Sequence, residues 1–226
     1  GRNNRKDGAN AMKIGVFDYG VGGLSVANSI QKAFPAEEVL LREDKENLPY
    51  GTKTPEQLLA LAEPILKEMV AEGCKVIVVA CNTVTTTIIE ELRKRINVPL
   101  IGMEPMIKPA AEMTKNGTIA VFATPTTLKS KRYAWLKSEY AKDTKVVEPD
   151  CSKWSSMIEH NEVDQNAIKQ NVDIALQARA DVIVLGCTHY HWIEGLIRKL
   201  ADGKAEVLQP EQPVIEQLKR VLEPLS

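Results

Sequence analysis

The chain has 226 residues, and its 29 Lys and Arg against 30 Asp and Glu give a formal net charge of -1. A net charge this close to zero provides no overall field to hold nucleic acid or an anionic membrane, so we expect neither as a partner. Hydrophobic residues make up 44% and charged residues 26% of the chain, which is typical of a globular protein with a buried core. The length suits one large domain or two small ones.

The first eleven residues are polar and rich in glycine and asparagine, without the apolar segment of a secretory signal. We expect a disordered tail or a non-native extension over residues 1–11. The longest apolar run, 76–81, is far shorter than the roughly 20 residues of a membrane helix. The four cysteines form no CxxC pair, which favours a reducing, cytoplasmic setting over a disulfide framework.

Short apolar runs rich in valine and isoleucine alternate along the chain with segments of helical period. The helix signal is clearest from Thr54, where Pro55 suits the first turn and Gln57 completes a capping box. Strands alternating with helices predict parallel sheets with helical crossovers. The expected strands are 13–18, 39–41, 76–80, 99–102, 118–123, 145–147, 182–186 and 206–208.

Several segments of the sequence recur about 105 residues later. The matching pairs are 14–17 with 119–122, 76–81 with 182–187, 91–94 with 195–199, and 104–105 with 209–210. Four landmarks that share one offset indicate an internal duplication. We therefore predict an α/β fold of two similar lobes related by a pseudo-two-fold axis, each a mainly parallel sheet flanked by helices.

Cys81 and Cys187 are equivalent residues of the two repeats, and each stands where a predicted strand gives way to a helix. Ligands bind at the carboxyl ends of parallel strands, so we expect the two thiols to face each other across an active-site cleft between the lobes. A helix N-terminus lowers the pKa of a thiol from about 8.5, which would draw both toward titration near neutral pH. Cys74 and Cys151 are interpreted as buried structural thiols.

Two thiols on opposite faces of one carbon suit stereoinversion, because one removes the α-proton as a thiolate and the other returns a proton as a thiol. Nucleophilic catalysis would need only one thiol. Asp18 ends the first predicted strand and His189 follows Cys187 by two residues, so each thiol has a titratable neighbour. The pattern favours an enzyme that inverts a stereocentre.

Uncharged hydrogen-bonding groups surround the two cysteines in the sequence, and they suit the carboxylate and ammonium groups of a small zwitterion. They are the side chains of Asn82, Thr83 and Thr188 and the backbone of Gly20, Gly22 and Gly23. Cys187, His189 and His191 alternate as zinc ligands can, but no fourth ligand stands nearby, so no metal is expected.

Four motifs resemble, in order and spacing, those of the cofactor-independent glutamate racemases of the aspartate/glutamate racemase family. They are FDxGVGGL at 17–24, PYG at 49–51, ACNT at 80–83 and GCTHY at 186–190. The resemblance runs from about residue 13 to residue 222. It implies an isomerase that uses no metal or pyridoxal phosphate, supplies D-glutamate for peptidoglycan in the cytoplasm, and commonly forms a homodimer.

The resemblance also implies roles for individual residues. Cys81 and Cys187 would be the two catalytic bases, with Asp18, His189 and Glu159 assisting them. Glu159 is matched because it stands eight residues after Cys151, as in the family. The positions that would contact substrate are Tyr19, Tyr50, Gly51, Asn82, Thr83, Thr124, Thr127 and Thr188.

The resemblance implies that the terminal strand and helix return to the first lobe. We therefore expect a first lobe of residues 12–97 plus 206–226 and a second lobe of residues 98–205.

Some residues near the expected pocket depart from the family pattern. Tyr19 replaces a small serine, and its phenol either excludes the longer side chain of glutamate or supplies a new hydrogen bond. The other departures are Val84-Thr85 for an Ala-Ser pair, His191 for a proline, and 42–44 for a glycine-containing turn. Two alternatives stay open: a racemase or epimerase acting on aspartate or another amino acid, and a non-catalytic protein that binds a small molecule.

Overall fold

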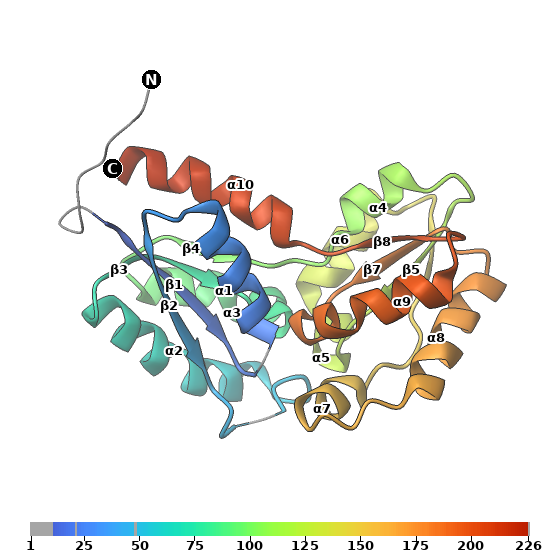
Figure 1. Cartoon of the computed structure of the whole chain (residues 1–226), viewed down its shortest axis with the longest axis horizontal. Helices are drawn as coiled ribbons and strands as arrows, with labels where there is room; N and C mark the ends of the chain where they lie inside the picture. The colour runs from blue at the N-terminus through green and yellow to red at the C-terminus, as the bar shows by residue number, and fades with distance from the viewer. Residues whose placement is uncertain (1–10, 21, 48, 226) are drawn as a thin grey trace.

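The computed structural model describes residues 11–20, 22–47 and 49–225. The expected tail therefore lies outside the described residues, apart from Ala11. The described chain forms two lobes, each built around a four-stranded sheet with helices on both sides (Figure 1).

The two sheets have the same topology. The first has the order β2-β1-β3-β4, the second has the order β6-β5-β7-β8, and all neighbouring strands are parallel. The first sheet contains β1 (Lys13–Asp18), β2 (Glu38–Glu43), β3 (Cys74–Val79) and β4 (Leu100–Gly102). The second contains β5 (Thr118–Phe122), β6 (Lys145–Val147), β7 (Val182–Leu185) and β8 (Glu206–Leu208). The predicted α/β fold of two similar lobes is confirmed.

The helices connect successive parallel strands. Before the chain leaves the first lobe they are α1 (Gly22–Ala33), α2 (Pro55–Ala71) and α3 (Asn82–Arg95). The second lobe carries α4 (Ile107–Met113), α5 (Pro125–Lys129), α6 (Lys131–Tyr140), α7 (Trp154–Glu159), α8 (Gln165–Gln177), the 3-10 helix η1 (Thr188–Ile193) and α9 (Glu194–Ala201). The chain ends with α10 (Glu211–Leu222) and η2 (Glu223–Leu225).

Both faces of each sheet are buried. Along β1 and β3, alternate side chains enter two different clusters: Phe17 and Ile77 pack on one side, and Val16 and Val78 on the other. A strand covered on both faces must be apolar throughout, which explains the continuous runs of valine and isoleucine. α10 packs on the first lobe, as expected for the terminal helix, with its buried face in the cluster that contains Val16.

The expected lobe boundaries are wrong at two short strands. β4 pairs with β3 in the first sheet, although residues 98–205 were assigned to the second lobe. β8 pairs with β7 in the second sheet, although residues 206–226 were assigned to the first. The reason is local: a strand that follows a crossover helix packs beside the preceding parallel strand. The chain therefore changes lobe after each of these strands rather than before it.

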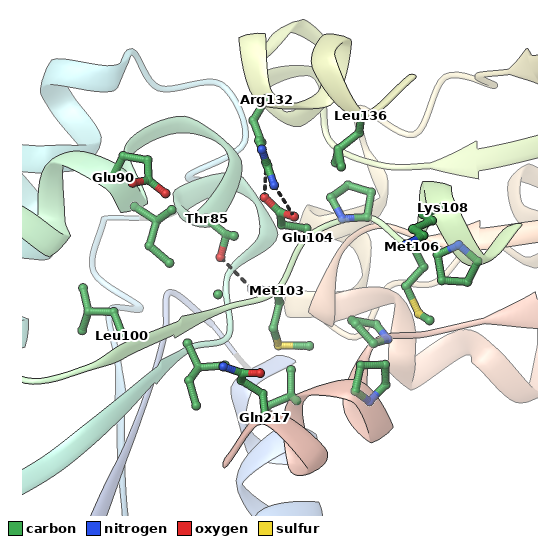
Figure 2. A pocket seen from close by; sticks show the side chains of 18 of the residues that line it. Thr85, Glu90, Leu100, Met103, Glu104, Met106, Lys108, Arg132, Leu136 and Gln217 are labelled. Carbon is green, nitrogen blue, oxygen red and sulfur yellow. Dashed lines mark hydrogen bonds and ion pairs between the residues drawn. The ribbon is translucent and has the colours of Figure 1, made fainter. Parts of the chain in front are cut away.

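A cavity of about 460 Å³ lies where the two lobes join. Residues of α3, β4, α6 and α10 line it, and Arg132 and Glu104 form an ion pair at its edge (Figure 2). Neither Cys81 nor Cys187 lines this cavity. Its lining therefore does not include the two thiols on which the predicted chemistry depends.

Candidate active site

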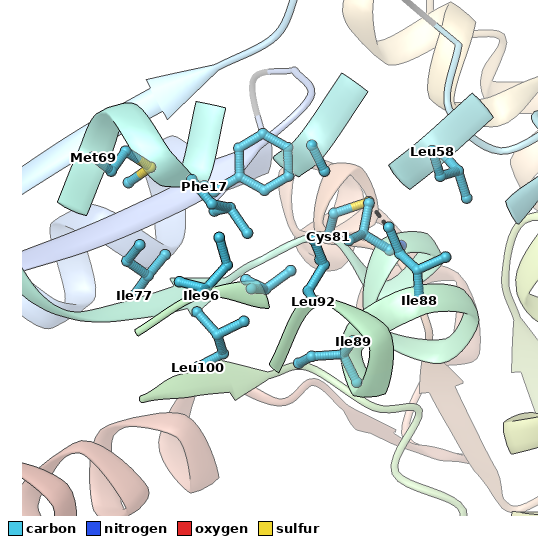
Figure 3. Packing of buried hydrophobic residues seen from close by; sticks show 14 of the residues in the cluster. Phe17, Leu58, Met69, Ile77, Cys81, Ile88, Ile89, Leu92, Ile96 and Leu100 are labelled. Carbon is cyan, nitrogen blue, oxygen red and sulfur yellow. Dashed lines mark hydrogen bonds between the residues drawn. The ribbon is translucent and has the colours of Figure 1, made fainter. Parts of the chain in front are cut away.

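The two thiols occupy equivalent places in the two sheets. Cys81 follows β3 and caps α3, because its Sγ accepts a hydrogen bond from the Val84 N–H at 3.4 Å. Cys187 follows β7 and precedes η1. Both are buried, with 1% and 3% of their surfaces exposed. Cys81 lies in the same apolar cluster as Phe17 and Leu58 (Figure 3), so the core of the first lobe forms one wall around its thiol.

Asp18 lies at the end of β1 and is completely buried. Its carboxylate accepts hydrogen bonds from the Tyr19 N–H at 2.8 Å and from the Thr188 hydroxyl at 2.5 Å. Burial raises the pKa of Asp18, while the charge of His189 and these two hydrogen bonds lower it; burial is the stronger effect. Thr188 belongs to the second lobe, so Asp18 links the lobes within the site.

The expected lowering of the thiol pKa by a helix N-terminus is wrong for Cys81. Burial, followed by the charge of Asp18, raises the pKa of Cys81 well above its ordinary value and outweighs the Val84 N–H. Cys81 is therefore a neutral thiol at neutral pH, ready to act as a proton donor.

Three polar side chains approach the sulfur of Cys187. The Ser155 hydroxyl lies 3.6 Å from Sγ, His189 Nδ1 lies 3.9 Å away, and the Tyr19 hydroxyl lies 4.0 Å away. His189 Nε2 is 2.8 Å from Glu159 Oε2. Burial lowers the pKa of His189, but its hydrogen bonds to Cys187 and Glu159 outweigh this effect and raise the pKa to about 10. His189 is therefore an imidazolium at neutral pH, placed between a thiol and a carboxylate.

Buried threonine hydroxyls form a second polar group across the lobes. Thr83, in the first turn of α3, is 2.8 Å from Thr124, the N-cap of α5, and Thr124 is 3.2 Å from Thr127. Thr86 is 3.5 Å from Thr127. Asn82 donates to the carbonyl of Met103 at 2.6 Å, while its buried Oδ1 has no hydrogen-bond partner among the described residues. That oxygen can accept a bond from an ammonium group.

Tyr50 and Gly51 reach the site from the loop after β2. The Tyr50 ring stacks on that of Tyr19, with centroids 4.7 Å apart and planes 9° apart. Its hydroxyl donates to Asp44 at 2.5 Å. The Gly51 carbonyl accepts a bond from the Thr126 N–H at 3.0 Å, so this loop also contacts the second lobe.

All the residues predicted for the site lie near the carboxyl ends of β1, β3, β5 and β7, or are linked to them by the contacts above. Sequence reasoning missed two participants, Asp44 and Ser155. Asp44 directly follows β2, which is two residues longer at this end than the expected strand 39–41, and the one available signal for it was the departure of 42–44 from the family pattern. Ser155 had no signal, because α7 approaches Cys187 only through the tertiary structure.

No cluster of three or more His, Cys, Asp or Glu in the described part of the chain is close enough to hold a metal ion. His189 contacts Glu159, whereas His191 Nδ1 lies 3.3 Å from Glu211, so the two histidines pair with different carboxylates. None of the described helices is long and apolar enough to cross a membrane.

A duplicated α/β fold with a buried thiol at the same strand end of each lobe is the arrangement of an isomerase that acts on both faces of one carbon. The sequence matches the Asp/Glu/Hydantoin racemase family over residues 14–218, and the chain belongs to that family. It is therefore a racemase-type isomerase.

Similar proteins agree with this assignment. The chain is 40% identical to the glutamate racemase of Pseudomonas syringae pv. tomato over 214 residues, which is 92% of this chain and 78% of the relative. It is 38% identical to that of Herpetosiphon aurantiacus over 213 residues, 92% of this chain and 84% of the relative. The crystal structure of Escherichia coli glutamate racemase in complex with L-glutamate and the activator UDP-MurNAc-Ala matches with a TM-score of 0.87 and 26% identity. That match covers 94% of this chain and 83% of that one.

The structure of Picrophilus torridus aspartate racemase also matches, with a TM-score of 0.65 and 16% identity, over 93% of this chain and 94% of that one. At that identity the likeness concerns the fold alone.

Proposed function

We propose that the protein interconverts L- and D-glutamate by two-base 1,1-proton transfer. The observation that carries the proposal is the pair of buried thiols, Cys81 and Cys187, at equivalent strand ends of the two lobes. The identities of 40% and 38% to glutamate racemases over most of the chain support glutamate as the substrate.

In the proposed reaction, one cysteine as thiolate removes the α-proton, and the electron pair stays on the α-carbon. The other cysteine as thiol then donates its proton to the opposite face, and the roles exchange for the other enantiomer. Asp18 lies beside Cys81, and the His189–Glu159 pair lies beside Cys187, so each thiol has its own group to assist proton movement. Because both thiols are buried, water is kept from the carbanion.

The polar groups around the thiols suit an amino acid. The hydroxyls of Thr83, Thr124 and Thr127 can donate to a carboxylate, and the free Oδ1 of Asn82 can accept from an ammonium group. Tyr19, Tyr50, Gly51 and Thr188 complete the predicted contacts.

A racemase for aspartate or another amino acid is the second candidate, and Tyr19 is the observation that favours it. The Tyr19 ring is 1% exposed and its hydroxyl is 4.0 Å from the Cys187 sulfur, so it takes up volume beside the reacting centre. A substrate with a shorter side chain than that of glutamate, such as aspartate, would need less space beside the Tyr19 ring.

One experiment separates the candidates. The protein is incubated in deuterated water with L-glutamate, D-glutamate or L-aspartate, while NMR follows exchange at Cα and circular dichroism follows chirality. Exchange and inversion of glutamate alone support the proposal, and turnover of aspartate alone moves the function to the second candidate. If the folded, reduced protein exchanges none of them, the proposed activity is rejected.

Substitution of either thiol tests the two-base scheme. Cys81→Ala and Cys187→Ala should each reduce racemisation by at least about 10³-fold, since each removes an acid or base that has no substitute. The loss in kcat/KM should be equal in both directions, because enantiomers have equal free energy. Cys74→Ala is the matched control: it removes a buried thiol from the start of β3 and should leave the rate unchanged. Full racemisation activity in either Cys81→Ala or Cys187→Ala would contradict the two-base mechanism.

We further infer a cytoplasmic enzyme that supplies D-glutamate for peptidoglycan and forms a homodimer. The four free thiols support a reducing compartment. The small net charge supports a small-molecule substrate rather than nucleic acid or a membrane as partner. Light scattering coupled to gel filtration would measure the oligomeric state, and a single 25.0 kDa species at micromolar concentration would contradict the dimer.

A further inference from the structure

The two thiols differ in the side chains that surround them. Cys187 Sγ has two neutral hydroxyls within 4.0 Å, those of Ser155 and Tyr19, in addition to the His189 ring. The hydrogen-bond donors given for Cys81 are backbone N–H groups at the start of α3, of which that of Val84 is at 3.4 Å. Among the described residues, hydroxyl groups therefore converge on one thiol only.

The Tyr19 hydroxyl is held in place by the contacts of its ring and by a side-chain hydrogen bond with Ser155, whose hydroxyl approaches the same sulfur. The ring stacks on Tyr50, which is fixed in turn by its bond to Asp44, and the His189 ring lies 4.8 Å away. Burial, together with the charges of Cys187 and Cys81, raises the pKa of Tyr19 well above its ordinary value. The phenol therefore keeps its proton and can donate it.

Ser155 approaches the same sulfur from the second lobe. It lies in the first turns of α7, four residues before Glu159, and is 9% exposed. Its hydroxyl is 3.6 Å from Cys187 Sγ. The Cys187 sulfur is therefore approached by one hydroxyl from each lobe, that of Tyr19 from the first and that of Ser155 from the second.

We propose that Tyr19 and Ser155 are positioning residues that donate hydrogen bonds to the Cys187 thiolate, so that Cys187 rather than Cys81 carries the negative charge before substrate binds. This inference rests on the proposed racemase function. When the thiolate takes the α-proton, it becomes a thiol, and the electron pair of the broken C–H bond remains on the α-carbon. Cys81 then gives its proton to the opposite face and becomes the thiolate. The hydroxyl bonds to Cys187 weaken at that point, because a thiol is a poorer acceptor than a thiolate.

The position of Tyr19 couples this effect to the contact between the lobes. Tyr19 follows β1 in the first lobe, whereas Cys187 and Ser155 belong to the second. The phenol can reach the sulfur only when the lobes are together.

Several titratable groups face Cys187 from the elements packed around it. His189, as an imidazolium, favours the thiolate, whereas a negative charge on Asp18 or Glu159 opposes it. The groups that have a charge interaction with Cys187 are Tyr19 at the end of β1, Cys81 before α3, Cys151 before α7, and His189 and Tyr190 on η1. Asp18 and Glu159 act on His189, which contacts the sulfur. The two hydroxyl donors offset part of the repulsion from the carboxylates.

The test measures how fast iodoacetamide alkylates the Cys187 peptide at each pH, using mass spectrometry of the full-length protein. Tyr19→Phe and Ser155→Ala should each raise the midpoint of this reaction by about one pH unit, the effect of losing one hydrogen bond to a charged group. The Cys81 peptide in the same digest is the internal reference. The acidic limb of the pH profile of kcat/KM should shift upward with the Cys187 midpoint.

One matched variant removes a nearby hydroxyl that does not contact the sulfur. Ser156→Ala changes the next residue of α7, whose hydroxyl lies 3.4 Å from His160 Nδ1. This variant should leave the Cys187 alkylation midpoint where it is in the native protein.

Unchanged Cys187 midpoints in the Tyr19 and Ser155 variants overturn the inference, and so does a shift confined to Cys81. Thermal denaturation identifies a variant that fails to fold, in which case the other variant decides. The alkylation readout needs no turnover. Absence of racemisation in the native protein therefore contradicts the proposed function, whereas unchanged midpoints in an active enzyme contradict only the role of the hydroxyls.

Discussion

Gly22 shows how closely the lobes meet beside the site. A Cβ at this position would lie 2.7 Å from the backbone carbonyl carbon of Thr188 and would also collide with its side chain. Thr188 donates to Asp18, so any displacement of Thr188 disturbs a buried carboxylate next to Cys81. The absence of a side chain at Gly22 is therefore what lets α1 begin against η1.

Gly22→Ala should destabilise the protein by about 1–3 kcal/mol, because backbone atoms must move to admit the methyl group. It should also lower kcat/KM. Gly195→Ala is the control, since a Cβ there meets nothing within 4 Å and alanine favours the α9 helix. Urea denaturation and racemisation assays of both variants check this, and equal stability of the two would contradict the steric argument.

The protonation of His189 makes the contribution of its Glu159 contact depend on pH. Its folded-state pKa of about 10 exceeds the unfolded value of 6.5. The stability that this difference provides is fully present below pH 6.5 and is lost as the pH rises through 10. Glu159→Gln should therefore cost about 1–3 kcal/mol at pH 6 and distinctly less at pH 10. Urea denaturation at the two pH values measures this, and a cost that grows with pH would contradict the charged state of His189.

At the scale of a single element, the start of α2 is set by hydrogen bonds between neighbouring residues of its first turn. The Thr54 hydroxyl caps the helix by accepting a hydrogen bond from the Gln57 N–H at 3.2 Å. The side-chain oxygen of Gln57 in turn accepts a hydrogen bond from the Thr54 N–H at 2.9 Å. The helix then continues through Pro64, which removes a backbone hydrogen bond. Packing of its buried face, Leu58, Ala62, Leu66 and Met69, maintains the helix beyond that point.

Thr54→Ala should destabilise the protein by about 1 kcal/mol, because the Gln57 N–H loses the hydroxyl that caps it. Thr54→Ser keeps the hydroxyl and should retain most of the stability. Racemisation rates of both variants should equal that of the native protein, since Thr54 lies outside the site. Thermal denaturation measures the stability of both variants. Equal losses of stability in Thr54→Ala and Thr54→Ser would show that the hydroxyl cap contributes nothing.

At the scale of the whole molecule, Glu211 joins three elements of the two lobes. Its carboxylate accepts bonds from Ser25 and Ser29 of α1, both at 2.7 Å, and lies 3.3 Å from His191 of η1. η1 also carries Thr188 and His189, so this link helps to hold part of the active site against the first lobe. Burial raises the pKa of Glu211, but His191, Ser29 and Ser25 outweigh it and lower the pKa below its ordinary value.

Glu211→Ala should cost about 1–3 kcal/mol at pH 7, because partly buried hydroxyls on α1 and the His191 ring on η1 lose their partner. Since the folded-state pKa of Glu211 lies below 4.5, its contribution is present above pH 4.5 and lost as the pH falls through the folded value. The cost should therefore shrink in urea denaturation at acidic pH. Glu216→Ala, which removes an exposed carboxylate from the same helix, should change stability by at most about 0.5 kcal/mol.

The sequence by itself determined the features that rest on local pattern. Continuous apolar runs marked the buried strands, Thr54 and Gln57 marked the start of α2, and the repeat at a spacing of about 105 residues indicated two equivalent lobes. The same repeat identified Cys81 and Cys187 as a pair. Each of these signals is contained within a few residues or in the regular recurrence of a few residues, so no knowledge of the folded chain was needed.

Only the tertiary structure decided to which lobe β4 and β8 belong, and which side chains contact the two thiols. The contact of Tyr19 with Cys187 joins residues 168 positions apart, and that of Ser25 with Glu211 joins residues 186 positions apart. No periodicity links such residues, because their approach depends on how two separately packed lobes fit together. Ser155 had no signal in the sequence for the same reason: it reaches Cys187 only because the second lobe brings α7 beside the end of β7.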